Sequence, residues 1–183
     1  MRSKRRIRRS QHSRIFKDGR GQIPEAISIR ERPAEVEDRA IPGHWEGDLL
    51  RGSKNSHIAT LVERHSRFAM LIKVPSKDTE AVVAALSQQV RKLPAILRRS
   101  LTWDLGLEMA KHKDFTVATD VKVYFCDPQS PWQRGSNENT NGLLRQYFPK
   151  GIDLSAYSQA KLKRGRSATQ RTAAQNTKLR DTR

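Results

Sequence analysis

The sequence has a single cysteine and lacks any long hydrophobic run. With only Cys126 available, the chain can form neither an internal disulfide nor a cysteine-based zinc cluster. No apolar stretch approaches the roughly 20 residues of a membrane-spanning helix, and the basic N-terminus lacks the apolar segment of a signal peptide. These absences exclude a disulfide-stapled scaffold and a helical membrane protein. They predict a cytoplasmic protein.

Acidic and aromatic residues are also scarce. The chain carries 19 Asp and Glu against 36 Lys and Arg, which gives a net charge of +17, and aromatic residues make up 6%. The hydrophobic fraction of 36% is below what a fully packed chain of this size usually carries, so part of the sequence is expected to lie outside a core. The positive charge predicts a polyanionic partner, DNA or RNA. Charge alone leaves open a solvated basic surface or a ribosomal-type tail.

The composition divides the chain into three zones. Residues 1–40 have no apolar period, and they are predicted to form a flexible basic arm that binds phosphate through arginines such as Arg5, Arg6, Arg8 and Arg9. Residues 41–160 have the alternating patterns of a packed α/β unit. Residues 161–183 are polar, basic and aperiodic, and a disordered tail is predicted there.

The middle zone contains regular strand and helix patterns. The helix that follows the third strand has apolar residues at helical spacing, with Asp78 as its expected N-cap and Pro94 at its end. The predicted strands are residues 45–50, 57–62, 68–74, 100–104 and 121–126, and the predicted helices are residues 79–93, 106–113 and 137–148. This order is expected of a ribonuclease-H-like mixed sheet flanked by helices.

Three carboxylates occupy positions that favour metal chemistry. Asp48 lies inside an apolar strand, where an unpaired acid is costly. Asp104 ends a strand, and Glu138 begins a helix. Cleavage of phosphodiesters requires metal ions that steady the attacking and leaving oxygens, and Mg²⁺ prefers oxygen ligands brought together from separate elements. The three acids are therefore candidate ligands.

Each acid also has a purely structural interpretation. Asp104 could form a turn or cap a helix, and Glu138 could complement a helix dipole. Glu46 lies two residues before Asp48 on the same strand face and competes with it as a ligand. The combination of acids, rather than any one of them, indicates a catalytic site.

Three sequence blocks carry a family resemblance. Residues 43–49 (Gly-His-Trp-Glu-Gly-Asp-Leu), residues 101–104 (Leu-Thr-Trp-Asp) and residues 132–139 (Trp-Gln-Arg-Gly-Ser-Asn-Glu-Asn) resemble the three catalytic blocks of insertion-sequence transposases of the IS30 family. The spacing between Asp104 and Glu138 also matches that family's pattern. The resemblance extends from about residue 30 through residue 151 and beyond.

The resemblance implies an integrase-type catalytic core that cuts insertion-element ends and joins the 3′-hydroxyl to target DNA, with two Mg²⁺ or Mn²⁺ ions as cofactors. Asp48 and Asp104 would bridge the ions, and Glu138 would complete the second ion's site. Further residues that could meet DNA are Arg134, Asn137, Asn141 and Arg145, although a solvated helix face is an equal alternative for the last two. The implied partner is DNA at the nucleoid; a homo-oligomer is possible, and no membrane or small-molecule substrate is expected.

The chain departs from the family pattern in three places. The family's helix-turn-helix region is replaced by the basic arm, and Leu105 stands where the family has arginine. After Ala160 the family's closing helix is missing, and we interpret the tail as an out-of-frame peptide that follows a frameshift near Lys163. An inactive remnant that binds DNA non-specifically is therefore the alternative to an active core. A structural RNA-binding protein is a third interpretation, which the acidic blocks contradict.

Overall fold

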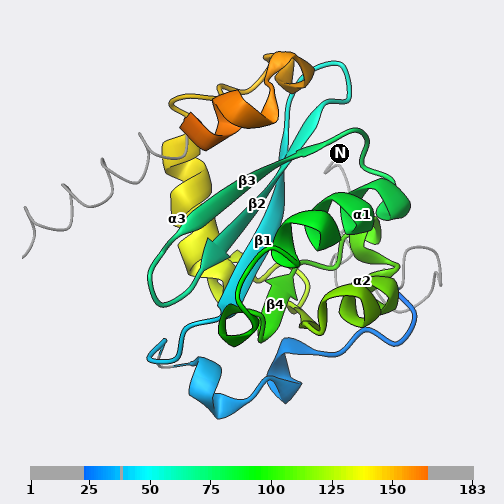
Figure 1. Cartoon of the computed structure of the whole chain (residues 1–183), viewed down its shortest axis with the longest axis vertical. Helices are drawn as coiled ribbons and strands as arrows, with labels where there is room; N and C mark the ends of the chain where they lie inside the picture. The colour runs from blue at the N-terminus through cyan, green and yellow to red at the C-terminus, as the bar shows by residue number, and fades with distance from the viewer. Residues whose placement is uncertain (1–22, 38, 165–183) are drawn as a thin grey trace, which may run out of the picture.

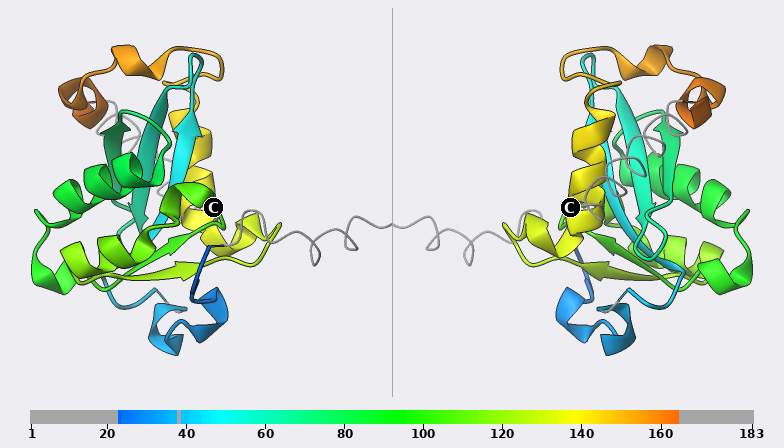
Figure 2. Two further views of the ribbon diagram at one scale, coloured as in Figure 1. Left: turned by 90° about the vertical axis from the view of Figure 1, so that its right-hand side faces the viewer. Right: turned by 90° about the vertical axis from the view of Figure 1, so that its left-hand side faces the viewer.

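The computed structural model describes residues 23–37 and 39–164 and contains a five-stranded mixed sheet with helices on both faces (Figures 1 and 2). The strands lie in the order β3-β2-β1-β4-β5, an order that the sequence pattern had not specified for the predicted ribonuclease-H-like sheet. The strands are β1 His44–Arg51, β2 His57–Glu63, β3 Ala69–Val74, β4 Ser100–Trp103 and β5 Lys122–Phe125, and the α-helices are α1 Thr79–Val90, α2 His112–Thr119 and α3 Gly135–Leu144. Single 3₁₀ turns are η2 Ile29–Glu31, η3 Ala34–Val36, η4 Ala95–Leu97, η5 Leu107–Met109, η6 Pro131–Arg134 and η7 Leu154–Ala156.

The central strand β1 sets the positions of the acids. It pairs antiparallel with β2, with Asp48 opposite Thr60, and parallel with β4, with Glu46 opposite Thr102. Adjacent parallel strands place their carboxyl ends at the same edge of a sheet, which is where ligands bind in open α/β sheets. The register therefore brings Asp48 close to Asp104, the residue that follows β4.

Two hydrophobic clusters hold the helices on opposite faces. The larger cluster packs α1 and α2 on one face around Trp103, Phe115 and Leu86, each of which is fully buried. The smaller cluster holds α3 and the chain after it on the other face, through Leu144 and Phe148. Figure 2 shows α1 and α2 on one side of the sheet and α3 on the other.

The helix predicted at residues 106–113 was wrong in its position. Residues 107–109 form only the 3₁₀ turn η5, and α2 begins at His112. Phe115 and Thr119 face the core from α2, while Asp120 takes a left-handed conformation with φ 59° that ends the helix. The burial of these side chains on the sheet therefore sets the helix later than local sequence signals indicated.

Segments at both ends of the middle zone also belong to the folded unit. Ile23, Ile29 and Val36 are buried, and Ser28 forms an isolated bridge with Phe125. Residues 23–37 therefore pack on the core, in contrast to the flexible arm predicted for them. At the other end, the first residues of the predicted tail also pack, since Leu162 joins the smaller cluster. Residues 1–22 and 165–183 lie outside the described part of the chain.

Candidate active site

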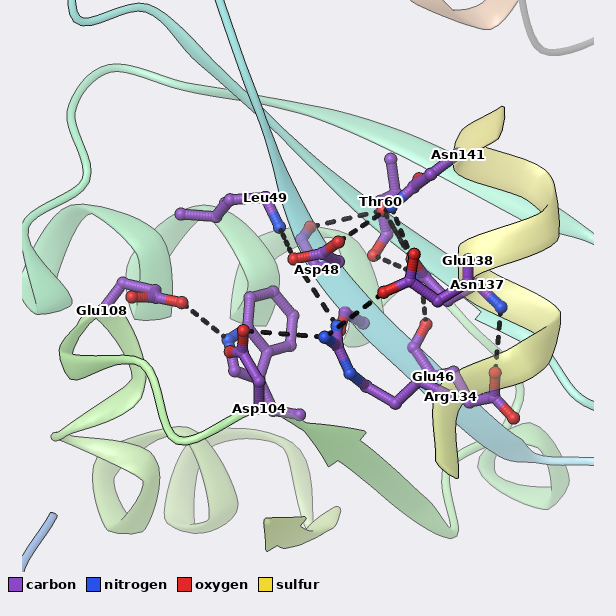
Figure 3. Close-up of polar contacts among 12 residues, drawn as sticks. Glu46, Asp48, Leu49, Thr60, Asp104, Glu108, Arg134, Asn137, Glu138 and Asn141 are labelled. Carbon is purple, nitrogen blue, oxygen red and sulfur yellow. Dashed lines mark hydrogen bonds and ion pairs between the residues drawn. The ribbon is translucent and has the colours of Figure 1, made fainter. Parts of the chain in front are cut away.

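The three predicted acids come from three different elements and converge on one arginine (Figure 3). Asp48 lies on β1, Asp104 follows β4, and Glu138 lies in the first turn of α3. The guanidinium of Arg134 approaches all of them: Nη1 is 3.5 Å from Asp48 Oδ1, and Nη2 is 3.6 Å from Asp104 Oδ2 and 3.7 Å from Glu138 Oε1. The fold thus brings together residues that are far apart in the sequence.

Arg134 is held firmly in this position. Its side chain is 7% exposed, and Nη1 donates a hydrogen bond of 2.8 Å to the backbone oxygen of Gly47 on β1. A buried guanidinium is costly unless anions compensate it, and three carboxylates that lie close together repel one another unless a cation compensates them. Arg134 and the acids therefore stabilise one another as a group.

The carboxyl group of Asp104 has a raised pKa. Burial raises the pKa of its carboxyl group to about 6, with smaller upward contributions from Glu108 and Asp48, while Arg134 acts in the opposite direction. Its Oδ1 atom is buried and has no hydrogen-bond partner in the described structure. A cation close to that oxygen would stabilise the ionised form.

Helix α3 is docked on three consecutive residues of β1. The side-chain amide of Asn137 donates to the backbone oxygen of Glu46 at 2.9 Å, Arg134 binds the oxygen of Gly47, and the amide of Asn141 donates to Asp48 Oδ2 at 2.9 Å. These bonds link the helix that carries Glu138 to the strand that carries Asp48. They fix the relative positions of two of the three acids.

Glu46, the competing ligand candidate, has an internal role. It has no exposed surface, and its two carboxylate oxygens accept from Arg64 Nη1 at 2.8 Å and from the backbone N–H of Asn137 at 2.9 Å. A carboxylate bound in this way is not available to a metal ion. The sequence identified the acid but gave no indication of Arg64, which lies in the turn after β2.

The structure separates the residues predicted to contact DNA. Asn137 is fully buried, and the guanidinium of Arg134 points at the acids, so neither presents its polar group to DNA in this arrangement. Asn141 is bound to Asp48, while the half-buried Arg145 donates to the backbone oxygen of Arg51 at 3.1 Å. A DNA contact by Asn141 and Arg145 stays a prediction. The N-terminal candidates Arg5, Arg6, Arg8 and Arg9 lie outside the described residues.

The acids offer donors suited to a hard cation. Within residues 23–37 and 39–164 no group of three or more Asp, Glu, His or Cys side chains is already arranged to hold a metal ion, because the acids are spread around Arg134. The donor set is nevertheless carboxylate oxygen, the ligand type that Mg²⁺ and Mn²⁺ prefer. Two buried oxygens, Asp104 Oδ1 and Asn141 Oδ1, lack partners among the described residues. The donor chemistry therefore fits a divalent cation.

Comparisons with known proteins identify the class. The integrase core domain family matches residues 38–131, and the chain belongs to that family. Catalytic integrase cores have the same fold: the bovine immunodeficiency virus (BIV) integrase core matches with a TM-score of 0.50 at 17% identity, over 68% of this chain and 80% of that one. A chain of the simian T-cell lymphotropic virus intasome matches with a TM-score of 0.51 at 17% identity, over 71% of this chain and 48% of that one. The predicted ribonuclease-H-like fold is confirmed.

The sequence relatives include transposases of insertion sequences. The chain is 54% identical over 151 residues to the transposase InsI of element IS30A from Escherichia coli strain K12, covering 82% of this chain and 39% of that protein. It is 56% identical over 146 residues to the transposase of element IS1086 from Cupriavidus metallidurans, covering 79% of this chain and 43% of that protein. These relatives confirm the predicted resemblance to IS30-type transposases. The chain spans about two fifths of the length of each.

Proposed function

We propose that this chain is the catalytic core of a transposase that cuts DNA at the ends of an insertion element and joins the 3′-hydroxyl to target DNA. The observation that carries the proposal is the convergence of Asp48, Asp104 and Glu138, from three elements, on the buried Arg134. Three gathered acids suit phosphodiester chemistry, in which positioning and charge stabilisation supply most of the rate. The 54% and 56% identities to transposases support the same reaction class.

Two Mg²⁺ or Mn²⁺ ions form part of the proposal, held by Asp48, Asp104 and Glu138. When bound, such ions polarise the scissile phosphate and lower the pKa of an attacking water. The chain's own residues prepare the site: Asn141 and the backbone N–H of Leu49 orient the carboxylate of Asp48. Arg134 lies among the three carboxylates and limits the repulsion between them.

The partner in this proposal is DNA, and the place of action is the cytoplasm at the nucleoid. The net charge of +17 supports a polyanionic partner. None of the helices in the described residues is long and apolar enough to cross a membrane. A homo-oligomer is included because one structural neighbour belongs to an intasome.

The test is metal-dependent cleavage of element-end DNA by the wild type, Asp104→Asn and Asp114→Asn. Asp114 is an exposed acid on α2, away from the site, and serves as the matched control. We expect Asp104→Asn to lose about 100-fold or more in rate, because a metal ligand is removed, while Asp114→Asn keeps wild-type activity. Cleavage that is equal in all three proteins, or absent in all three, would favour the inactive DNA-binding remnant.

A further inference from the structure

A second polar feature lies beside the N-terminal segment, and Gln133, the residue before Arg134, is part of its lining. It is an open pocket of about 430 Å³ that lies between residues 29–37 with Arg39, the turn after β2, and η6. Its volume is within the range of about 300–1,000 Å³ that small-molecule pockets occupy. The lining consists of four arginines, one acid and three further side chains: Arg30, Arg32, Arg39 and Arg64, then Glu37, and Ile29, Trp132 and Gln133.

Two of the arginines retain N–H donors that no group in the described residues uses. The side chains of Arg32 and Arg64 are 3% and 5% exposed, and the Nε atom of each is buried without a hydrogen-bond partner. Their terminal nitrogens are anchored, since Arg32 binds Thr102 and Glu37, and Arg64 binds Glu46. Buried donors without partners are costly, and guanidinium groups match phosphate oxygens in geometry. These two guanidinium groups contribute positive charge beneath the pocket, while Arg30 and Arg39 are exposed in its lining and present donors that an anionic oxygen can reach.

Trp132 adds an exposed aromatic surface to this pocket. Its exposure is 73%, whereas Trp45 and Trp103 are 3% and 0% exposed and belong to the core. The next residue, Gln133, exchanges two hydrogen bonds with Asp127, through its Oε1 at 2.8 Å and its Nε2 at 3.0 Å. These bonds fix the segment that carries Trp132. An indole held in place and open to solvent is suited to stack a nucleobase.

Residues that line the pocket are close in the chain, or bound directly, to residues that contact the acids. Trp132 precedes Arg134 by two residues, and Arg134 contacts all three acids. On the other side, Arg64 binds Glu46, which precedes Asp48 by two residues on β1. A DNA strand whose reacting phosphodiester lies at the acids would therefore extend its neighbouring nucleotides toward this pocket.

We propose that the pocket binds an unpaired nucleotide of the DNA strand next to the reacting phosphodiester, with its phosphate on the arginines and its base stacked on Trp132. This inference rests on the proposed function, because it concerns the same DNA substrate. A base inside a duplex is stacked on both sides and cannot offer its face to the indole. The pocket thus selects single-stranded over duplex DNA near the cleavage point.

The test uses the full chain in EDTA, so that no cleavage occurs. A short single-stranded oligonucleotide and a blunt hairpin duplex are titrated in turn while tryptophan emission and acrylamide quenching are recorded. Trp132 is the exposed tryptophan, so it dominates the acrylamide response. We expect the single strand to quench this emission and to protect it from acrylamide. Trp132→Ala should weaken single-strand binding about tenfold, a typical loss for one stacked base, and duplex binding much less.

Three further variants distinguish nucleotide binding at the pocket from a general effect of positive charge and from loss of folding. Trp132→Phe keeps an aromatic face and should retain most single-strand affinity, while Arg39→Gln should lose affinity for the single strand. Arg91→Gln removes an exposed charge at the end of α1 and should change neither the single-strand affinity nor the duplex affinity. Unchanged thermal midpoints would show that the variants fold.

Two results would overturn the inference. One is equal loss of single-strand and duplex affinity in Trp132→Ala, and the other is no change in tryptophan emission on single-strand binding. The proposed function is tested separately, by metal-dependent cleavage with the wild type. Cleavage without any change in Trp132 emission would reject the nucleotide-binding pocket and support the transposase core. A change in Trp132 emission without cleavage would reject the proposed reaction and support the nucleotide-binding pocket.

Discussion

At the scale of single residues, Arg134 forms ion pairs with all three predicted acids. Its guanidinium lies within 3.7 Å of three carboxylates, each of which is partly exposed. We expect Arg134→Ala to lower the free energy of unfolding by about 1–3 kcal/mol, the range for a broken buried pair after allowance for solvent screening of the acids. Urea unfolding measures this change, and Arg91→Ala, which removes an exposed arginine, is the control.

The same variant also tests whether the acids attract divalent cations. Because Arg134→Ala leaves the carboxylates uncompensated, added Mg²⁺ should raise its thermal midpoint more than that of the wild type. An equal shift in the two proteins would mean that the acids do not form a common cation site.

Cys126 offers a second prediction at this scale. Burial raises the pKa of its thiol to about 11, so the thiolate fraction at pH 8 should be about 100-fold below that of an exposed cysteine. Iodoacetamide should therefore label the native protein slowly and the urea-unfolded protein quickly. Equal labelling rates would contradict the buried position of this residue, which directly follows β5.

At the scale of elements, the docking of α3 on β1 decides the geometry of the site. Glu46 joins Arg64 to the first turn of α3, and both of its carboxylate oxygens are occupied. We expect Glu46→Ala to destabilise the fold by about 3–5 kcal/mol, because it leaves a buried arginine unpaired. Glu46→Gln keeps an acceptor for Asn137 and should recover part of this loss in chemical unfolding. Equal stability of Glu46→Ala and the wild type would exclude this role.

The sequence predicted the elements of the site better than their contacts. The polar Asp48 inside an apolar strand and the position of Asp104 at a strand end are local signals, and together with Glu138 and the family resemblance they selected the acids. The pairing of Glu46 with Arg64 depends on the register of β1 with β2, which local patterns do not specify. Likewise, Arg134 was predicted as a DNA contact, because nothing in its neighbourhood in the sequence indicates burial against three acids.

The position of one helix was predicted wrongly for the same reason, because local sequence patterns do not show tertiary contacts. The pattern around residues 106–113 contains helix-forming residues, but the burial of Phe115 beneath the sheet places α2 further along the chain. In the N-terminal zone, isolated apolar residues such as Ile23 and Ile29 gave no periodic signal and yet are buried. Tertiary packing, rather than local propensity, decided these two regions.

At the scale of the whole molecule, the excess of positive charge should govern DNA affinity. With a net charge of +17, binding without Mg²⁺ should weaken steeply with salt, because phosphate contacts release counterions. We expect a slope of log affinity against log salt of about −4 or steeper, which corresponds to four or more phosphate contacts. Fluorescence anisotropy with labelled duplex DNA measures it. An affinity that is constant between about 50 and 200 mM salt would contradict an electrostatic interface.

Equilibrium Mn²⁺ binding tests whether Asp48, Asp104 and Glu138 together hold divalent cations. Calorimetric titration would compare the wild type with Asp48→Asn, Asp104→Asn and the exposed control Asp114→Asn. We expect saturable Mn²⁺ binding by the wild type and by Asp114→Asn, and at least about tenfold weaker binding by Asp48→Asn and Asp104→Asn. Equal Mn²⁺ affinity in all four proteins would show that the convergence of the acids on Arg134 does not create a metal site.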